Sequence, residues 1–344
     1  MRREVYSLQI ISPCFAGGAE PEKQAEVRAP TIRGQLRWWF RVLGGFSSLS
    51  GMAVRAQEER IFGATAGGCG VASPLIVRTR QRCVSTVIKD ADQLDVPVNS
   101  PEGYLLFPLR SNPKKGVYAG RGLFTEHKLP DFDLELVWRG SAGLWDDIRA
   151  LACVFGHLGS LGFRSRRAMG ALAYRGQAPD LQAALLRFAQ PSNIAIRSLP
   201  ASNSSEAVQI LAVWLRKWRS YGRSPSNLNP FKAGFEFAKN DHDIAAKNIP
   251  GPAFRPALGL PIVSKYGDWN FGPGKPKGRF ASPVLLRPHR NASGWRALVI
   301  FVDKHRWDSS APAYFEGHVR PVSLGLYDAM REDALTNPLF AAFP

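Results

Sequence analysis

The chain has 344 residues, enough for about two domains, and its 45% hydrophobic and 21% charged content is ordinary for a globular protein. Its 45 Lys and Arg residues outnumber 28 Asp and Glu residues, and the formal net charge of +17 favours a polyanionic partner. The four cysteines form no C-x-x-C pair and no apolar run approaches transmembrane length, which argues against a zinc cluster and a membrane protein. We expect a cytoplasmic protein without a secretory leader, a metal or a cofactor.

A strand is predicted over residues 5–11, and a helix follows a loop that contains Gly17 and Gly18. Thr31 is expected to cap this helix after Pro30, and Gly44-Gly45 is expected to end it. Apolar residues at helical spacing predict the buried face of the helix: Ile32, Leu36, Trp39, Phe40 and Leu43.

Three arginines of the same helix, Arg33, Arg37 and Arg41, recur every four residues and form a stripe away from the apolar face. No carboxylate lies between Arg28 and Arg55 to neutralise them. This stripe therefore predicts contact with an anion.

Two glycine-containing segments are predicted to form the walls of a phosphate cradle. Gly17-Gly18 and the helix start at 31–34 would supply one wall, where Gly34 has no side chain and lets a backbone come close. The loop at 158–170 would supply the other wall, because glycines admit an anion and guanidiniums clamp phosphates. Its residues are Gly159, Gly162, Arg164, Arg166 and Arg167. The loop is not a P-loop, because the G-K-S/T ending is missing.

The order of the other elements predicts the fold. The first half has a helical turn over 58–62, a glycine-rich loop over 63–70, strands over 74–87, 104–109, 132–138 and 168–174, and a helix from Ser141 to 156–159. The second half has strands over 193–199, 280–287 and 295–302 and helices over 207–221 and 326–334, with little regular pattern in the Pro/Gly-rich stretch up to Pro276. We predict an α+β protein of two ferredoxin-like (RRM-like, β-α-β-β-α-β) domains with long loop insertions, at 1–190 and 191–344.

Four windows contain basic residues and no acid: 27–57, 148–179, 207–235 and 269–302. The last window carries Lys275, Lys277 and Arg279. Aromatic residues are interleaved with the basic ones, as single-stranded nucleic acid binding requires, although helical spacing places many of them in the core. Asp90, Asp92 and Asp95 lack the glycine and glutamate of a calcium loop and favour a solvated turn over a metal site.

The segments at 17–21, 28–41 and 159–167, together with those at 257–261 and 279–283, resemble the RAMP superfamily. More narrowly, they look like the first-numbered RAMP subunits of the Cmr complex, the type III-B CRISPR RNA-guided effector. The most specific part is the run Arg28-x-Pro30-x-Ile32-Arg33-Gly34-x-Leu36-Arg37-x-Trp39-x-Arg41. The chain departs from the family at Ala168-Met169, where the superfamily's loop usually has another glycine.

The resemblance implies a non-catalytic, RNA-binding role in antiviral defence in the prokaryotic cytoplasm. The partners it implies are the 3′ part of the guide crRNA, the 5′ part of a single-stranded target RNA, and other RAMP subunits. The RNA-binding residues would be those of the cradle and the stripe, with Arg28, Lys275, Lys277 and Arg279.

Two alternatives stay open. In the first, the chain is a metal-independent RAMP endoribonuclease, with His157 beside the glycine-arginine loop as general base. His157 equally suits the end of a helix, where it would satisfy terminal carbonyls. In the second, the chain is a scaffold subunit whose arginines meet acidic protein partners instead of RNA.

Overall fold

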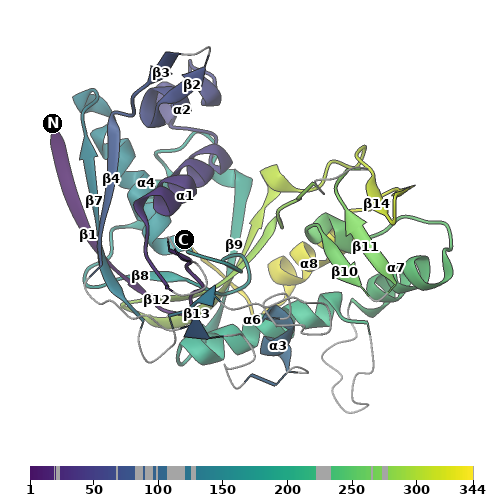
Figure 1. Cartoon of the computed structure of the whole chain (residues 1–344). Helices are drawn as coiled ribbons and strands as arrows, with labels where there is room; N and C mark the ends of the chain where they lie inside the picture. Colours follow the sequence, from purple (N-terminus) through teal and green to yellow (C-terminus); the bar gives the residue numbers. More distant parts are fainter. Residues whose placement is uncertain are drawn as a thin grey trace.

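A computed structural model of the chain describes residues 1–18, 20, 24–66, 69–81, 88–89, 96–97, 100–106, 121–124, 129–221, 234–264, 266–272 and 278–343. Helices and antiparallel sheets are mixed throughout, as the sequence predicts (Figure 1). None of the helices in these ranges is both long and apolar enough to span a bilayer.

The first sheet has four antiparallel strands in the order β4-β7-β1-β8. They are β1 (Arg2–Ile10), β4 (Leu75–Gln81), β7 (Asp131–Trp138) and β8 (Leu172–Tyr174), with helices α1 (Ala29–Val42) and α4 (Trp145–Leu158) between them in the chain. Tyr6, Leu8 and Ile10 alternate along β1 toward the core, which the two helices share.

The second sheet repeats this order as β12-β13-β9-β16, again with antiparallel neighbours. Its strands are β9 (Ile194–Ala201), β12 (Val284–Asn291), β13 (Gly294–Val302) and β16 (Ala341–Ala342), and its helices are α6 (Ser204–Arg219) and α8 (Gly325–Thr336). The predicted strands and helices of this half therefore exist, with shifted ends.

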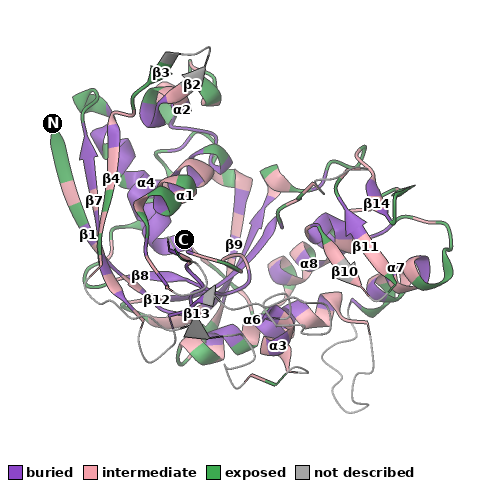
Figure 2. Cartoon of the chain, in the orientation of Figure 1, coloured by how far each residue is buried: buried purple, intermediate pink, exposed green. Residues whose placement is uncertain are grey.

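The strands of the second sheet are coloured mostly as buried or half-buried in Figure 2, and the last six residues of β13 are buried on both faces of the sheet. Leu298, Ile300 and Val302 of β13 join the core of the first sheet, α1 and α4. The alternate residues Val299 and Phe301 join a second core with α6 and α8. This two-sided burial explains why β13 reads as a continuous apolar run.

A smaller lobe with its own core, which includes Trp269 and Trp307, occupies the right of Figure 1. Its elements are α7 (Phe235–Lys247), β10 (Ile262–Ser264), β11 (Gly267–Asn270), β14 (Ala313–Phe315) and β15 (His318–Arg320). The prediction of little regular structure up to Pro276 is therefore wrong for this part of the chain.

The remaining elements are short. They are α2 (Val54–Phe62), α3 (Pro101–Leu106), α5 (Leu181–Leu185), the strands β2 (Ala64–Ala66), β3 (Cys69–Val71), β5 (Ile88–Lys89) and β6 (Arg121–Gly122), and the 3-10 turns η1 (Ser47–Leu49), η6 (Ala142–Leu144), η7 (Pro191–Asn193), η9 (Arg255–Leu258) and η10 (Asp303–His305). The loop predicted over 63–70 contains a β2–β3 hairpin, and the strand predicted over 104–109 begins inside α3. Both errors come from reading short segments whose tertiary partners are not visible in the sequence.

Two buried histidines and a buried arginine lie where β12 meets α4. The Nε2 of His157 donates to the carbonyl of Pro179 (2.8 Å), so its Nδ1 must accept from Nε2 of His289 (3.2 Å). The Arg287 guanidinium donates to the carbonyls of Gly159 (2.8 Å) and Leu172. Both imidazoles are therefore neutral, and Nδ1 of His289 is buried with no hydrogen-bond partner among the residues that the structure describes.

This histidine pair predicts that the fold is sensitive to acid. Burial, followed by the positive charge of Arg287, lowers the pKa of His289 to about 2. In the unfolded chain, a histidine has a pKa of about 6.5. Below that pH the unfolded chain binds a proton that the folded chain does not bind, so the free energy of unfolding falls as the pH drops. Between pH 7 and pH 5 we expect His289 to lower the free energy of unfolding by about 2 kcal/mol, measured by denaturant titration.

The variant His289→Gln tests this assignment, because its amide can still donate to His157 but does not titrate. It should lose the His289 share of the pH dependence, whereas His318→Gln, at an exposed position, should keep it. The same pH dependence in His289→Gln as in the wild type would contradict the prediction.

Candidate nucleic-acid interface

Among the described residues, no side chain caps the start of α1. The helix begins at Ala29, Arg28 occupies the N-cap position with an extended backbone, and Pro30 lies in the first turn. The prediction that Thr31 caps this helix is wrong, because the fixed φ of proline suits the first turn and its missing N–H is not needed there. No acid lies in that turn, so the positive end of the helix dipole is available to an anion.

The far end of α1 agrees better with the sequence. The helix ends at Val42, and Gly44 and Gly45 follow with φ of +77° and +78°. The N–H of Gly45 donates to the carbonyl of Phe40 (2.9 Å), which closes the last turn.

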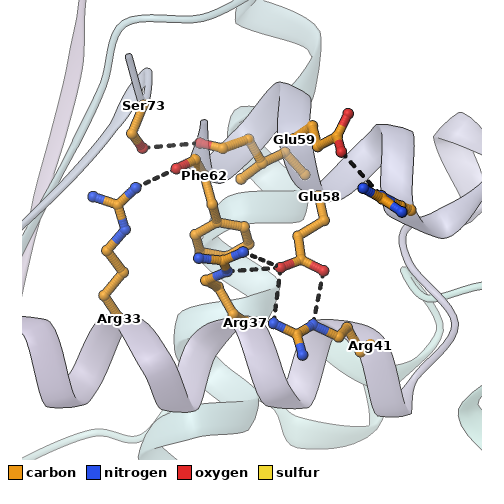
Figure 3. Close-up of polar contacts among 9 residues, drawn as sticks. Arg33, Arg37, Arg41, Glu58, Glu59, Phe62 and Ser73 are labelled. Atoms are coloured by element: carbon orange, nitrogen blue, oxygen red, sulfur yellow. Dashed lines mark hydrogen bonds and ion pairs between the residues drawn. The ribbon is translucent and has the colours of Figure 1, made fainter. Parts of the chain in front are cut away.

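The arginine stripe of α1 faces α2, as Figure 3 shows. Glu58 accepts from Nε of Arg37 (2.7 Å) and from Nε and Nη2 of Arg41 (2.7 and 2.9 Å). Arg33 donates to the carbonyl of Phe62 at the end of α2. Burial alone would raise the pKa of Glu58, but the hydrogen bonds from Arg41 and Arg37 outweigh it and lower that pKa.

The expectation of an unneutralised stripe is therefore corrected: Glu58, from the next helix, neutralises part of it. Three guanidiniums and one carboxylate still leave a net charge of two positive units. The side chains of Arg37 and Arg41 are 38% and 51% exposed, whereas that of Glu58 is 10% exposed. An anion that approaches α1 thus meets the guanidiniums before the carboxylate.

A pocket of about 350 Å³ lies at the start of α1 and brings together the two predicted walls of the cradle. Gly17, Arg28 and Thr31 line one side, and Gly162 and Phe163 line the other. The Glu26 side chain also borders the pocket, 3.9 Å from Arg28. We refer to this pocket as the α1 pocket.

Three glycines near the α1 pocket differ in how much space the structure leaves for a side chain at their positions. Gly162 has φ of +78°, and a Cβ there would lie 2.6 Å from the Phe15 carbonyl oxygen. A Cβ on Gly18 would lie 2.7 Å from Oε2 of Glu26. A Cβ on Gly34 would meet nothing within 4 Å, although glycine in a helix is unfavourable. Packing therefore accounts for Gly162 and Gly18 but not for Gly34. Gly159, at the end of α4, also has no space for a Cβ, which would strike Phe155.

The arginines of the second element point into the protein rather than into the α1 pocket. Arg167 is 6% exposed and donates to the carbonyls of Val284 (2.9 Å) and Leu258 (3.2 Å) and to Oγ of Ser282 (3.0 Å). Burial lowers its pKa well below the ordinary arginine value. The expectation that Arg167 clamps a phosphate does not fit this position, because the guanidinium joins the loop to the second half of the chain.

Its two neighbours are also held by carbonyls. Arg166 donates to the carbonyl of Ser282 (2.6 Å) and lies over the Trp38 ring at 4.7 Å. Arg164 donates to the carbonyl of Leu105 (2.7 Å). Burial lowers the pKa of both guanidiniums to about 10.

Ala168, where the family usually has a glycine, keeps a glycine-like backbone. Its φ is +68°, and its N–H donates to the carbonyl of Leu286 (2.9 Å). The left-handed conformation is unfavourable for alanine by about 1 to 2 kcal/mol. Ala168 therefore adopts the left-handed backbone conformation that a glycine would favour at this position.

The other predicted site residues lie elsewhere. Arg279 is exposed and does not line the α1 pocket, and Lys275 and Lys277 lie outside the described residues. Asp90, Asp92 and Asp95 also lie outside them, and within the described ranges no three His, Cys, Asp or Glu side chains gather into a metal site.

Most of the interleaved aromatics are core residues, as their spacing predicts. Trp39, Trp218 and Trp269 are buried, and the Trp38 ring packs against Arg166 and His305. The exposed aromatic at the α1 pocket is instead Phe163, which is 45% exposed. Sequence reasoning missed it, although it lies between Gly162 and Arg164, and an aromatic side chain among basic residues is a signal for base stacking.

His157 is buried and both of its ring nitrogens are engaged. Burial lowers its pKa. This geometry does not fit a general base for a ribose 2′-hydroxyl, which needs a nitrogen within reach of substrate.

Comparisons with known proteins agree with these motifs. Residues 7–173 match the model of the RAMP superfamily. The Cmr subunit Cmr1-2 of Pyrococcus furiosus is 36% identical over 66 residues, 19% of this chain, and Cmr1-1 of the same organism is 27% identical over 151 residues, 43% of this chain. These matches span 35% and 40% of the length of the two relatives.

Two solved structures share the fold along nearly the whole chain. The apo crystal structure of Cmr1 from Pyrococcus furiosus matches 97% of both chains with a TM-score of 0.55 at 15% identity. A chain of the type III-B Cmr-beta complex bound to cognate target RNA covers 96% of this chain and 98% of its own, with a TM-score of 0.50 at 11% identity. Residues 7–173 therefore match the RAMP superfamily, and the chain resembles Cmr1 subunits in sequence over part of its length and in fold over nearly all of it.

Proposed function

We propose that this protein is a non-catalytic RNA-binding subunit of a type III-B Cmr effector complex in the prokaryotic cytoplasm. In this role it holds the 3′ part of the guide crRNA, the 5′ part of the target RNA, or both, beside other RAMP subunits. The observation that carries the proposal is the α1 pocket, where an uncapped helix start, Arg28, Gly17 and Phe163 converge. Helix starts and arginines suit phosphates, and an exposed phenylalanine suits an unstacked base.

The proposal includes two ferredoxin-like units, at 1–190 and 191–344. The identical order of the two four-stranded sheets supports it. The N-terminal unit would carry the α1 pocket, and the small lobe of α7, β10, β11, β14 and β15 would be an insertion in the C-terminal unit.

Arg28 is the most direct test of RNA binding, because it is exposed at the helix start and takes no part in the Glu58 cluster. We expect the purified chain to bind fluorescein-labelled single-stranded RNA, with log affinity falling linearly with log salt concentration. Arg28→Gln should weaken binding and reduce the magnitude of that slope by about 0.7, the value for one lost phosphate contact.

Arg139→Gln is the matched control, since Arg139 is exposed and lines neither pocket. Charge reversal of Arg37 or Arg41 is avoided, because it would place a second carboxylate against Glu58. A wild-type chain without affinity for RNA, or equal slopes for Arg28→Gln and wild type, would contradict the proposed site.

The variant Gly34→Ala tests whether the glycine serves RNA binding rather than the stability of α1. No atom lies within 4 Å of a Cβ at this exposed helical position, so alanine should raise the free energy of unfolding by about 0.5 to 1 kcal/mol. RNA binding should weaken at the same time, if a sugar-phosphate backbone approaches the bare helix surface. Thermal unfolding and fluorescence anisotropy measure the two effects, and Gly51→Ala, in an open turn, is the control. A more stable Gly34→Ala protein with unchanged RNA affinity would argue against this approach.

A further inference from the structure

A second pocket, of about 500 Å³, lies at the other end of α1. Its walls come from Gln190 and Asn193, from the segment that contains Asp303, Lys304 and Arg306, and from the first turns of α8 with Tyr327 and Arg331. We refer to it as the α8 pocket. Sequence reasoning did not single out any of these residues.

The α8 pocket is joined to α1 by direct contacts. The Asn193 side chain donates to the carbonyl of Val42 (2.7 Å), and the N–H of Gln190 donates to the carbonyl of Leu43 (2.9 Å). The ring of His305 stacks on Trp38 of α1, with centroids 5.7 Å apart and planes 14° apart. Because α1 has 14 residues, the two pockets are separated by about 20 Å along its axis.

One carboxylate of the α8 pocket is already satisfied. Oδ1 of Asp303 accepts from the Tyr327 hydroxyl (2.7 Å), and Oδ2 accepts from Nη2 of Arg331 (3.1 Å). These bonds hold Asp303 at the floor of the pocket. The positive charge of Arg331 offsets the negative charge of Asp303, so the carboxylate repels an incoming anion less.

Two basic residues of the pocket differ from Arg331, which bonds Asp303. Lys304 and Arg306 are exposed, and within the described residues neither side chain forms an ion pair. Asp328, in the first turn of α8, is the other carboxylate that lines the pocket. The pocket therefore combines two exposed cations, Lys304 and Arg306, with one exposed carboxylate, Asp328, and the amide groups of Gln190 and Asn193.

This combination suits a nucleotide better than an extended protein surface. A volume of about 500 Å³ lies within the range of small-ligand pockets. Lysine and arginine suit a phosphate, and side-chain amides can bond the polar edge of a base.

We propose that the α8 pocket is a second RNA contact site, which receives a phosphate and its nucleotide a few positions along the strand held in the α1 pocket. This inference rests on the proposed function, because it assigns one strand to both ends of α1. Lys304 and Arg306 are the phosphate-binding residues of the site.

The test measures affinity as a function of RNA length. Fluorescein-labelled single-stranded oligoribonucleotides of increasing length are titrated with the full chain at several salt concentrations. In the wild type, affinity should rise in a step once the RNA is long enough to reach from the α1 pocket to the α8 pocket. The double variant Lys304→Gln/Arg306→Gln should lose this step, bind long RNA about tenfold more weakly, and show a salt slope smaller by about 1.4, or about 0.7 for each of two contacts.

The double variant Arg2→Gln/Arg139→Gln removes the same charge from exposed residues that line neither pocket, and it should behave as wild type. An unchanged length step and an unchanged salt slope in Lys304→Gln/Arg306→Gln would overturn the inference. The proposed function would still stand in that case if Arg28→Gln weakens RNA binding and reduces the salt slope as expected. The inference would also be overturned, in favour of a general charge effect, if Lys304→Gln/Arg306→Gln weakens the binding of short and long RNA equally. The same holds if the control variant weakens binding as much. Normal RNA binding with lost assembly onto other Cmr subunits would overturn it in favour of an acidic protein partner.

Discussion

Two buried guanidiniums with carbonyl partners hold the halves of this protein together. Arg167 lies in the loop before β8 and bonds carbonyls around β12, while Arg287 lies on β12 and bonds carbonyls on either side of that same loop. Removing a cation from water is costly, and only a full set of well-placed acceptors offsets that cost. The pair therefore tolerates little displacement of the loop relative to β12. Gly162 and Phe163 lie in this loop, so the same hydrogen bonds fix the position of their wall of the α1 pocket.

The regular elements could be predicted because their burial leaves a periodic or continuous apolar pattern in the sequence. The apolar face of α1 and the continuous run of β13 are visible in the sequence, and both are core in the structure. The α7 helix was missed because its surroundings are rich in proline and glycine. Its buried residues serve the separate core of a small lobe.

The candidate site was predicted less well, for a different reason. An arginine has the same appearance in the sequence whether it meets a phosphate, a carboxylate or a carbonyl. Glu58 lies 17 residues after Arg41, so its ion pair depends on how α2 folds back on α1. Arg167 looked like a phosphate ligand because its partners are more than 90 residues away. The meeting of Gly17, Thr31 and Gly162 around one pocket was nevertheless foreseen from the order of the strands.

The two-sided burial of the second sheet also bears on how the chain is made. During synthesis, the first half emerges before β9, β12 and β13, whose residues Ile196, Leu285 and Ile300 complete its core. Until residue 302 has left the ribosome, the apolar surface that receives these strands stays exposed to water. The first half thus cannot bury its whole core while the chain is still growing, and its final packing has to wait for β12 and β13, which are encoded more than 100 residues downstream of β8.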